Sequence, residues 1–137
     1  MASMTERYRR DGTVAARSLY RTGLTTADAL TTLETPLSSG ALLRNLVGRP
    51  TLAVAVEFTT ASDDVQVLVL IYDRSNGTDV LLGAQKATAT ADATARRTAS
   101  GKYISAPLLF DTLGGTHYEV RLYDAPAAAV DIRAWEY

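Results

Sequence analysis

Residue types that carry out chemistry are sparse in this sequence. His117 is the only histidine and there is no cysteine, which excludes a histidine pair for a metal, a thiolate site and a cysteine nucleophile. No G-x-S-x-G motif offers a serine nucleophile, and no G-x-x-x-x-G-K-[ST] or G-x-G-x-x-G loop is present to hold a nucleotide. The sequence therefore predicts no catalytic centre, no cofactor and no bound metal, and we expect the chain not to be an enzyme.

Carboxylates are the remaining candidates for catalysis or metal binding. A glycosidase needs two of them across a cleft, and a calcium ion needs several in one loop. Asp63 and Asp64, and the loop 73–79, supply oxygens, but the loop lacks the D-x-[DN]-x-[DN]-G arrangement of a calcium site. We expect most of the candidate acids to lie at strand ends or on solvent-exposed faces, namely Glu57, Asp73, Asp111, Glu119, Asp124 and Glu136.

Arginines near the N-terminus form the first candidate binding site. Residues 1–49 carry seven arginines against four acidic residues, a net charge of +3, whereas residues 50–137 have a net charge of −4. Such an arm can grip an acidic protein surface, the alternative being a solvated tail. Three clustered arginines are too few for strong nucleic-acid binding, so we expect a protein partner and no specific nucleic acid. The candidate residues are Arg7, Tyr8, Arg9, Arg10, Arg17 and Arg21.

Aromatic residues toward the C-terminus form the second candidate site. Tyr123, Trp135 and Tyr137, together with Tyr103, are able to form a platform on which sugar rings stack. The alternative is that the single tryptophan packs in the core or at a sheet edge, because large aromatic side chains are usually buried. Carbohydrate binding is therefore the second function to test.

The elements that position these residues are predicted to be β-strands. Residues 51–60 alternate apolar and polar side chains, the period of a strand with one buried face, whereas residues 65–73 are apolar on both faces, which is typical of a central strand. Asn76-Gly77 predicts a hairpin turn, with a returning strand over 80–86. The buried face of the first of these strands would present Leu52, Val54, Val56 and Phe58.

The C-terminal half continues the strand pattern. Residues 86–101 alternate alanine and threonine, which favours a strand over a loop, and residues 102–110 form a strand interrupted by Pro107. Residues 117–124 and 127–137 alternate regularly. The predicted inward-facing side chains are Tyr118, Val120, Leu122, Val130, Ile132 and Ala134, and the outward-facing ones include His117, Glu119, Arg121, Tyr123, Asp131, Arg133 and Trp135.

These strands predict an all-β fold. The chain has 137 residues, of which 47% are hydrophobic, and six to eight strands follow one another without helical crossovers, as in an antiparallel sandwich or barrel. We expect extended chain at 13–22 and 28–34, a basic N-terminal arm over 1–22 and a single sandwich domain over 23–137. No apolar run is long enough for a membrane span or follows the first arginines as in a signal peptide, so no membrane association is expected.

The order of motifs resembles small β-sandwich proteins of tailed bacteriophage virions. The sequence TPLSSGALL at 35–43 precedes the strand at 51–60, a hairpin follows, and THYEVRLYD leads through a small loop to the final strand. The resemblance covers about three quarters of the chain, residues 35–137. Its motifs serve turns and core, through Gly40, Asn76, Gly77, Tyr118, Arg121 and Trp135.

The resemblance implies a jelly-roll-like sandwich and a structural role. It points to a capsid decoration, or cement, protein made in the host cytoplasm and located in the virion. Its partners would be the major capsid protein or other virion proteins, and the chain would form a homo-oligomer, expected to be a trimer. The basic arm would become ordered on docking. The alternative is a carbohydrate-binding or receptor-binding module of a tail or secreted protein.

Overall fold

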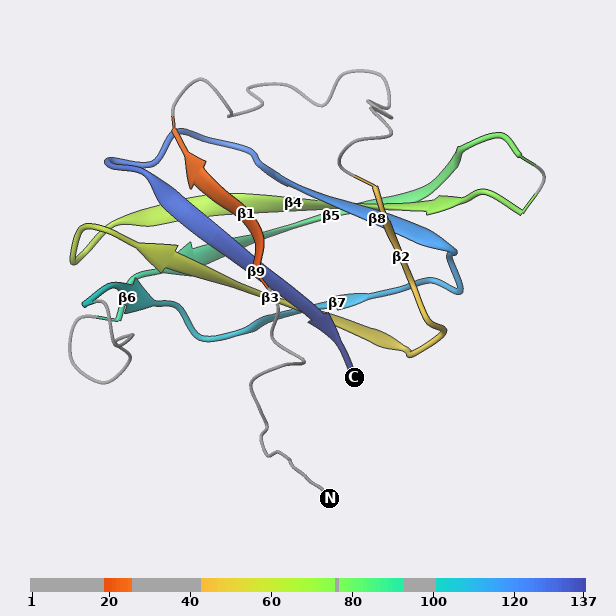
Figure 1. Ribbon diagram of the computed structural model, residues 1–137, viewed down its shortest axis with the longest axis horizontal. Helices are drawn as coiled ribbons and strands as arrows, with labels where there is room; N and C mark the ends of the chain where they lie inside the picture. Colours follow the sequence, from red (N-terminus) through yellow and green to blue (C-terminus); the bar gives the residue numbers. More distant parts are fainter. Residues whose placement is uncertain (1–18, 26–42, 76, 93–100) are drawn as a thin grey trace.

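The protein is built from β-strands arranged in two packed sheets (Figure 1). The computed structural model describes residues 19–25, 43–75, 77–92 and 101–137. Within these ranges there are nine strands and no helix. This confirms the prediction of an all-β antiparallel sandwich, because every pairing between the described strands is antiparallel.

The two sheets divide the chain in an interleaved way. Sheet A contains β1 (Leu19–Leu24), β9 (Val130–Glu136) and β3 (Thr51–Phe58) in that spatial order, with β6 (Tyr103–Ile104) and β7 (Leu108–Asp111) both paired to the far edge of β3. Sheet B contains β2 (Arg44–Asn45), β8 (His117–Leu122), β4 (Asp64–Asp73) and β5 (Val80–Thr90).

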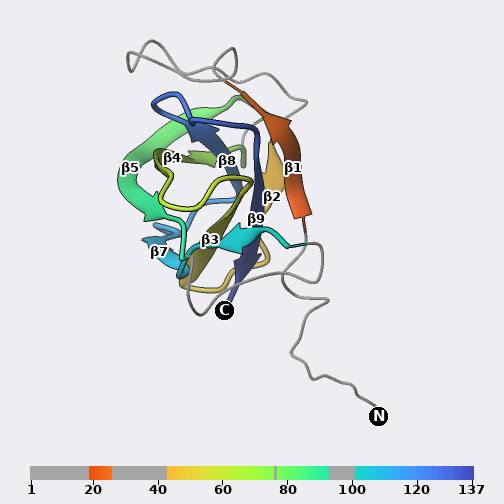
Figure 2. The ribbon, with the colours of Figure 1, turned by 90° about the vertical axis from the view of Figure 1, so that its left-hand side faces the viewer.

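The strand pairings are nested, which is the arrangement of a jelly roll. β1 pairs with β9, β2 with β8, β3 with β7, and β4 with β5. The chain is therefore a long antiparallel ribbon wound into two layers. Each layer has four strands when β6 and β7 are counted as one. Figure 2 shows the two layers end-on, with β5 curling toward β7. The jelly-roll-like topology is therefore confirmed.

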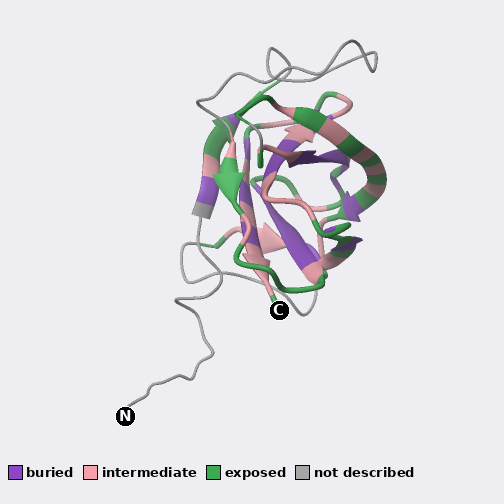
Figure 3. Cartoon of the chain, turned by 90° about the vertical axis from the view of Figure 1, so that its right-hand side faces the viewer, coloured by how far each residue is buried: buried purple, intermediate pink, exposed green. Residues whose placement is uncertain are grey.

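The core lies between the sheets and follows the predicted alternation. Most of its members come from β3, β4, β8 and β9, with others from β1, β5 and β7, and they are buried in the centre of the molecule (Figure 3). β4 is buried on both faces, as expected for a central strand, and its second face forms a separate apolar cluster on the outside of sheet B. The inner cluster includes Leu52, Val54, Val56, Phe58, Val65, Val67, Val69, Ile71, Val120, Leu122 and Ile132, and the outer one contains Leu68, Leu70 and Tyr72.

Pro107 interrupts the edge of sheet A as the sequence predicted. β6 pairs with the end of β3 and β7 with its beginning, and Ser105 fills the gap between them. The Val56 amide donates to Ser105 Oγ at 3.0 Å, and the Ser105 amide donates to Val56 O at 2.9 Å. The buried backbone of β3 thus remains paired where the proline cannot donate.

The first described strand begins earlier than the predicted domain boundary. Leu19–Leu24 pairs with β9, and the Val120 amide donates to the Tyr20 hydroxyl at 3.2 Å between the two sheets. Residues 19–22 therefore belong to the sandwich, although the predicted arm included them. The predicted extended segment at 28–34 lies outside the described residues, as do residues 93–100 of the alanine-threonine segment. The preceding residues 86–90 are strand.

Two of the six candidate acids are buried, contrary to the prediction that most lie at strand ends or on exposed faces. Glu57 is 4% exposed and Glu119 is not exposed at all. Both lie on the outward-facing side of their strands, but each is covered and paired with an arginine: Glu57 with Arg133, and Glu119 with Arg121 at 2.7 Å. The alternation predicted correctly on which face of its strand each acid lies. The error was to treat the outward face of a sheet as exposed to solvent.

Candidate functional site

A row of three residues crosses the outer face of sheet B. Leu68 on β4 is paired with Lys86 on β5 and with Arg121 on β8. Residues directly opposite each other in antiparallel strands project to the same face. Leu68 belongs to the outer cluster, so an apolar side chain lies between two cationic residues on this face. Tyr123, at the end of β8, packs against the same cluster.

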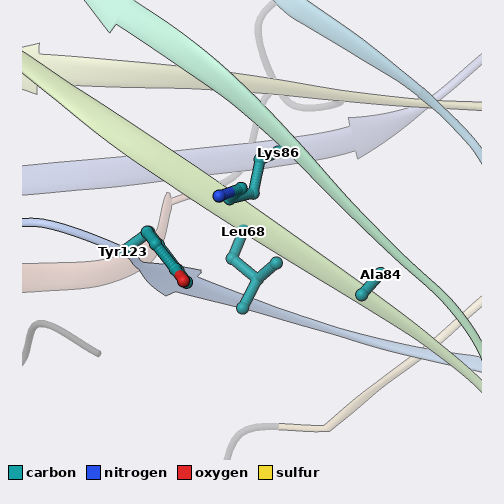
Figure 4. A pocket seen from close by; sticks show the side chains of 4 residues that line it. All are labelled: Leu68, Ala84, Lys86 and Tyr123. Atoms are coloured by element: carbon teal, nitrogen blue, oxygen red, sulfur yellow. The ribbon is translucent and has the colours of Figure 1, made fainter. Parts of the chain in front are cut away.

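A small pocket opens over Leu68 (Figure 4). It has a volume of about 120 Å³ and is lined by Leu68, Ala84, Lys86 and Tyr123. Leu68 is 1% exposed. The ammonium of Lys86 lies 4.0 Å from the centre of the Tyr123 ring, a cation–π contact that holds the charge at the pocket. The pocket thus combines apolar walls with one positive charge.

A buried ion pair lies beside this pocket. Arg121 Nη1 donates to Glu119 Oε2 at 2.7 Å, and the arginine side chain is 18% exposed. Burial, followed by the charge of the nearby Glu119, raises the pKa of Tyr72 to about 12. Within the described part of the chain, three buried polar atoms of this group have no hydrogen-bond partner of normal geometry, namely Tyr72 Oη, Glu119 Oε1 and Arg121 Nε.

The outer face of sheet A carries a different charged group. Glu57 and Asp131 are directly opposite each other, and each is paired with a cation: Glu57 with Arg133, and Asp131 with Lys102 at 2.7 Å. The Gly23 amide also donates to Asp131 at 2.9 Å. Burial acts to raise the pKa of Asp131, but the Lys102 hydrogen bond and the Gly23 amide outweigh it and lower this pKa. These charged side chains are therefore explained by ion pairs within the fold.

The residues of the predicted arginine site are only partly described. Arg7, Tyr8, Arg9, Arg10 and Arg17 lie outside the described residues. Arg21 lies in β1, where Leu19–Leu24 pairs with β9, so it is held in sheet A.

The predicted aromatic platform is divided between the two sheets. Tyr123 lies at the outer face of sheet B. Trp135 is on β9 in sheet A, opposite Ala53, and Tyr137 follows the same strand with 51% of its surface exposed. Tyr103 packs against the core between the sheets. Tyr123 therefore does not share a surface with Trp135 and Tyr137.

The described ranges contain no cluster suited to a metal ion. No group of three or more histidine, cysteine, aspartate or glutamate residues is placed to hold a metal ion in the part of the chain that the structure describes. His117 Nδ1 forms a hydrogen bond of 2.8 Å with Thr116 Oγ1. Across residues 19–25, 43–75, 77–92 and 101–137 no helix is long and apolar enough to cross a membrane.

The pocket over Leu68 was not predicted from the sequence. One signal was present: Lys86 is the only charged residue in the eleven-residue run of β5. Its neighbour Tyr123 is 37 positions away in the sequence, and only the nested pairing of β5, β4 and β8 brings the two together.

Comparisons with protein-family models, with curated proteins and with solved structures found no match to this chain.

Proposed function

We propose that this chain is a structural protein of a bacteriophage virion, a capsid decoration (cement) protein that binds the shell and stabilises it as an oligomer. The observation that carries the proposal is the nested strand order of a jelly roll in a chain whose motifs resemble phage sandwich proteins. Jelly rolls build viral capsid domains, and they also build lectin and cupin domains. Fold alone does not select among these functions, so the choice rests on the motif order.

The distribution of charge supports a role in binding rather than catalysis. Within the described residues, four acidic side chains form ion pairs with arginine or lysine side chains of the same chain, on both sheets. The N-terminal arginines, by contrast, give residues 1–49 a net charge of +3 in the sequence. An arm of this charge is suited to an acidic surface on a major capsid protein or another virion protein. The arm would bind the shell, and the sandwich would be the compact domain that the arm holds there.

The carbohydrate-binding alternative has less support. Its predicted platform included Tyr123 with Trp135 and Tyr137, and Tyr123 lies on the other sheet from Trp135. A sugar site built on Trp135 and Tyr137 alone would change the tryptophan fluorescence on glycan addition. An unchanged emission across a glycan screen would remove this alternative.

Co-sedimentation with particles tests the proposal. The purified chain is added to particles of a phage that lacks the gene for it. After sedimentation, the amount of the chain in the pellet is measured relative to the major shell protein. We expect saturable binding at a fixed ratio to the shell protein, with increased resistance of the particles to heat or chelators. Failure to pellet with the particles at saturating concentration would contradict the proposal.

A further inference from the structure

The outer face of sheet B holds a positive charge that has no acidic partner in the described structure. Lys86 makes a cation–π contact with Tyr123 and no ion pair among residues 19–25, 43–75, 77–92 and 101–137. Arg121, on the other side of Leu68, is neutralised by Glu119, but its Nε has no acceptor within these ranges. The row of Arg121, Leu68 and Lys86 therefore has a net charge of +1 after the Glu119 pair is counted, and the exposed Lys86 carries that charge.

The position of Lys86 suits one anionic group. Its side chain is exposed on β5, directly opposite Leu68, and it lines the pocket. A carboxylate above Leu68 would accept a charge-assisted hydrogen bond from the Lys86 ammonium. Arg121 Nε is buried and outside the pocket lining, so it supplies no donor to such a ligand.

The walls of the pocket select for a short apolar stem. Leu68 and Ala84 provide aliphatic surface below the charge, and the volume is about 120 Å³. A cavity of about 150 Å³ holds a benzene ring, so this pocket has room for one short side chain. The two methylene groups and terminal carboxylate of glutamate match this combination, whereas phosphate and sulfate ions have no stem to place on Leu68.

We propose that the pocket over Leu68 binds the side chain of a glutamate on the protein partner, with Lys86 as the principal recognition residue. This inference rests on the proposed function for its partner, because a decoration protein must find a surface on the shell. The recognition of a carboxylate by the pocket does not depend on that function. Lys86 contributes the charge, Tyr123 orients the ammonium, and Leu68 and Ala84 contact the methylene groups.

Nuclear magnetic resonance on the full chain tests the chemistry of the site. The isotope-labelled protein is titrated with N-acetyl-glutamate methylamide and, in parallel, with the glutamine analogue. We expect saturable shifts of the amides of Leu68, Ala84, Lys86 and Tyr123 with the glutamate probe, weak as for a single side chain, and at least a tenfold weaker response with glutamine. Equal responses to the two probes would overturn the assignment.

Three variants separate recognition from folding. Lys86→Met keeps the length of the side chain without its charge and should weaken the glutamate response at least tenfold, while Lys86→Arg should retain most of it. Arg49→Met is the matched control, since it removes an exposed cation from the loop between β2 and β3, and its titration should equal that of the unchanged protein. A Lys86→Met protein that binds the glutamate probe normally would contradict the proposal.

Particle binding then tests whether the glutamate belongs to the partner. Lys86→Met should reduce co-sedimentation with particles about tenfold, and Arg49→Met should not. If the probe binds but Lys86→Met sediments with particles like the unchanged protein, the assignment to a shell partner is wrong. If the unchanged protein binds the probe but never binds particles, the proposed virion function fails while the carboxylate chemistry of the pocket is retained.

Discussion

The side-chain amide of Gln85 bonds twice to the backbone of Asp111 and thereby joins the two sheets. Gln85 Nε2 donates to Asp111 O at 2.9 Å, and the Asp111 amide donates to Gln85 Oε1 at 3.1 Å. A primary amide carries the same donor and acceptor as a peptide group, so Gln85 acts toward β7 as a neighbouring strand would. β5 is at the edge of sheet B and β7 is at the edge of sheet A. The pair closes one open side of the jelly roll.

Removal of this bridge should loosen the edge without unfolding the sandwich. Gln85→Ala is expected to lower the free energy of unfolding by roughly 1 kcal/mol, because two partly exposed hydrogen bonds are lost. Amide hydrogen exchange should accelerate at Asp111, whereas Thr88→Ala on the same strand should leave it unchanged. Unaltered exchange at Asp111 in Gln85→Ala would show that the bridge does not hold β7.

The buried ion pair on sheet B should be costly to break from one side only. Glu119→Leu leaves the Arg121 charge largely buried without its partner and is expected to lower the free energy of unfolding by about 3 kcal/mol. The double variant Glu119→Leu with Arg121→Met should recover most of this loss, since neither charge remains. Urea denaturation of both variants measures the effect, and a double variant no more stable than the single one would contradict it.

High pH should destabilise the fold through its buried tyrosines. Burial is the main cause that raises the pKa of both Tyr72 and Tyr118 to about 12, against 10.0 in the unfolded chain. Above pH 10 the unfolded state therefore loses these protons first, so stability is full below pH 10 and falls as the pH rises to about 12. Free energies of unfolding across this window should fall less steeply for Tyr72→Phe. An identical slope for this variant would be evidence against a raised Tyr72 pKa.

Periodicity in the sequence was sufficient to predict most of the fold. The inward face of β3 and the doubly buried β4 followed from alternation and from the lack of it, and Pro107 marked the interruption between β6 and β7. The burial of Glu57 and Glu119 could not be predicted this way, because period two assigns a face but does not show what covers that face.

The candidate site depended on contacts between distant segments. Lys86 and Tyr123 come together only because β4 lies between β5 and β8, and no local pattern specifies that order. For the same reason the sequence does not show that Tyr123 and Trp135 are separated, because β8 and β9 belong to opposite sheets. Spacing along the chain does not distinguish the two layers of a sandwich.

The N-terminal arginines should contribute to attachment. Replacing Arg7, Arg9 and Arg10 together with alanine removes three positive charges from the arm and should weaken binding to particles, with a stronger effect at low salt than at high salt. The melting temperature should not change, since these residues precede the described sandwich. Equal binding of the variant and the unchanged protein at low salt would exclude the arm from docking.

The virion assignment is tested most directly by the number of copies on particles. Particles released by the producing cells are separated on a density gradient, the fractions are probed with an antibody to this chain, and mass spectrometry gives its amount relative to the major shell protein. We expect hundreds of copies on DNA-filled particles, as for a protein that decorates the shell. A handful of copies would place the chain at the neck or tail instead, and its absence from every particle fraction would contradict a virion role.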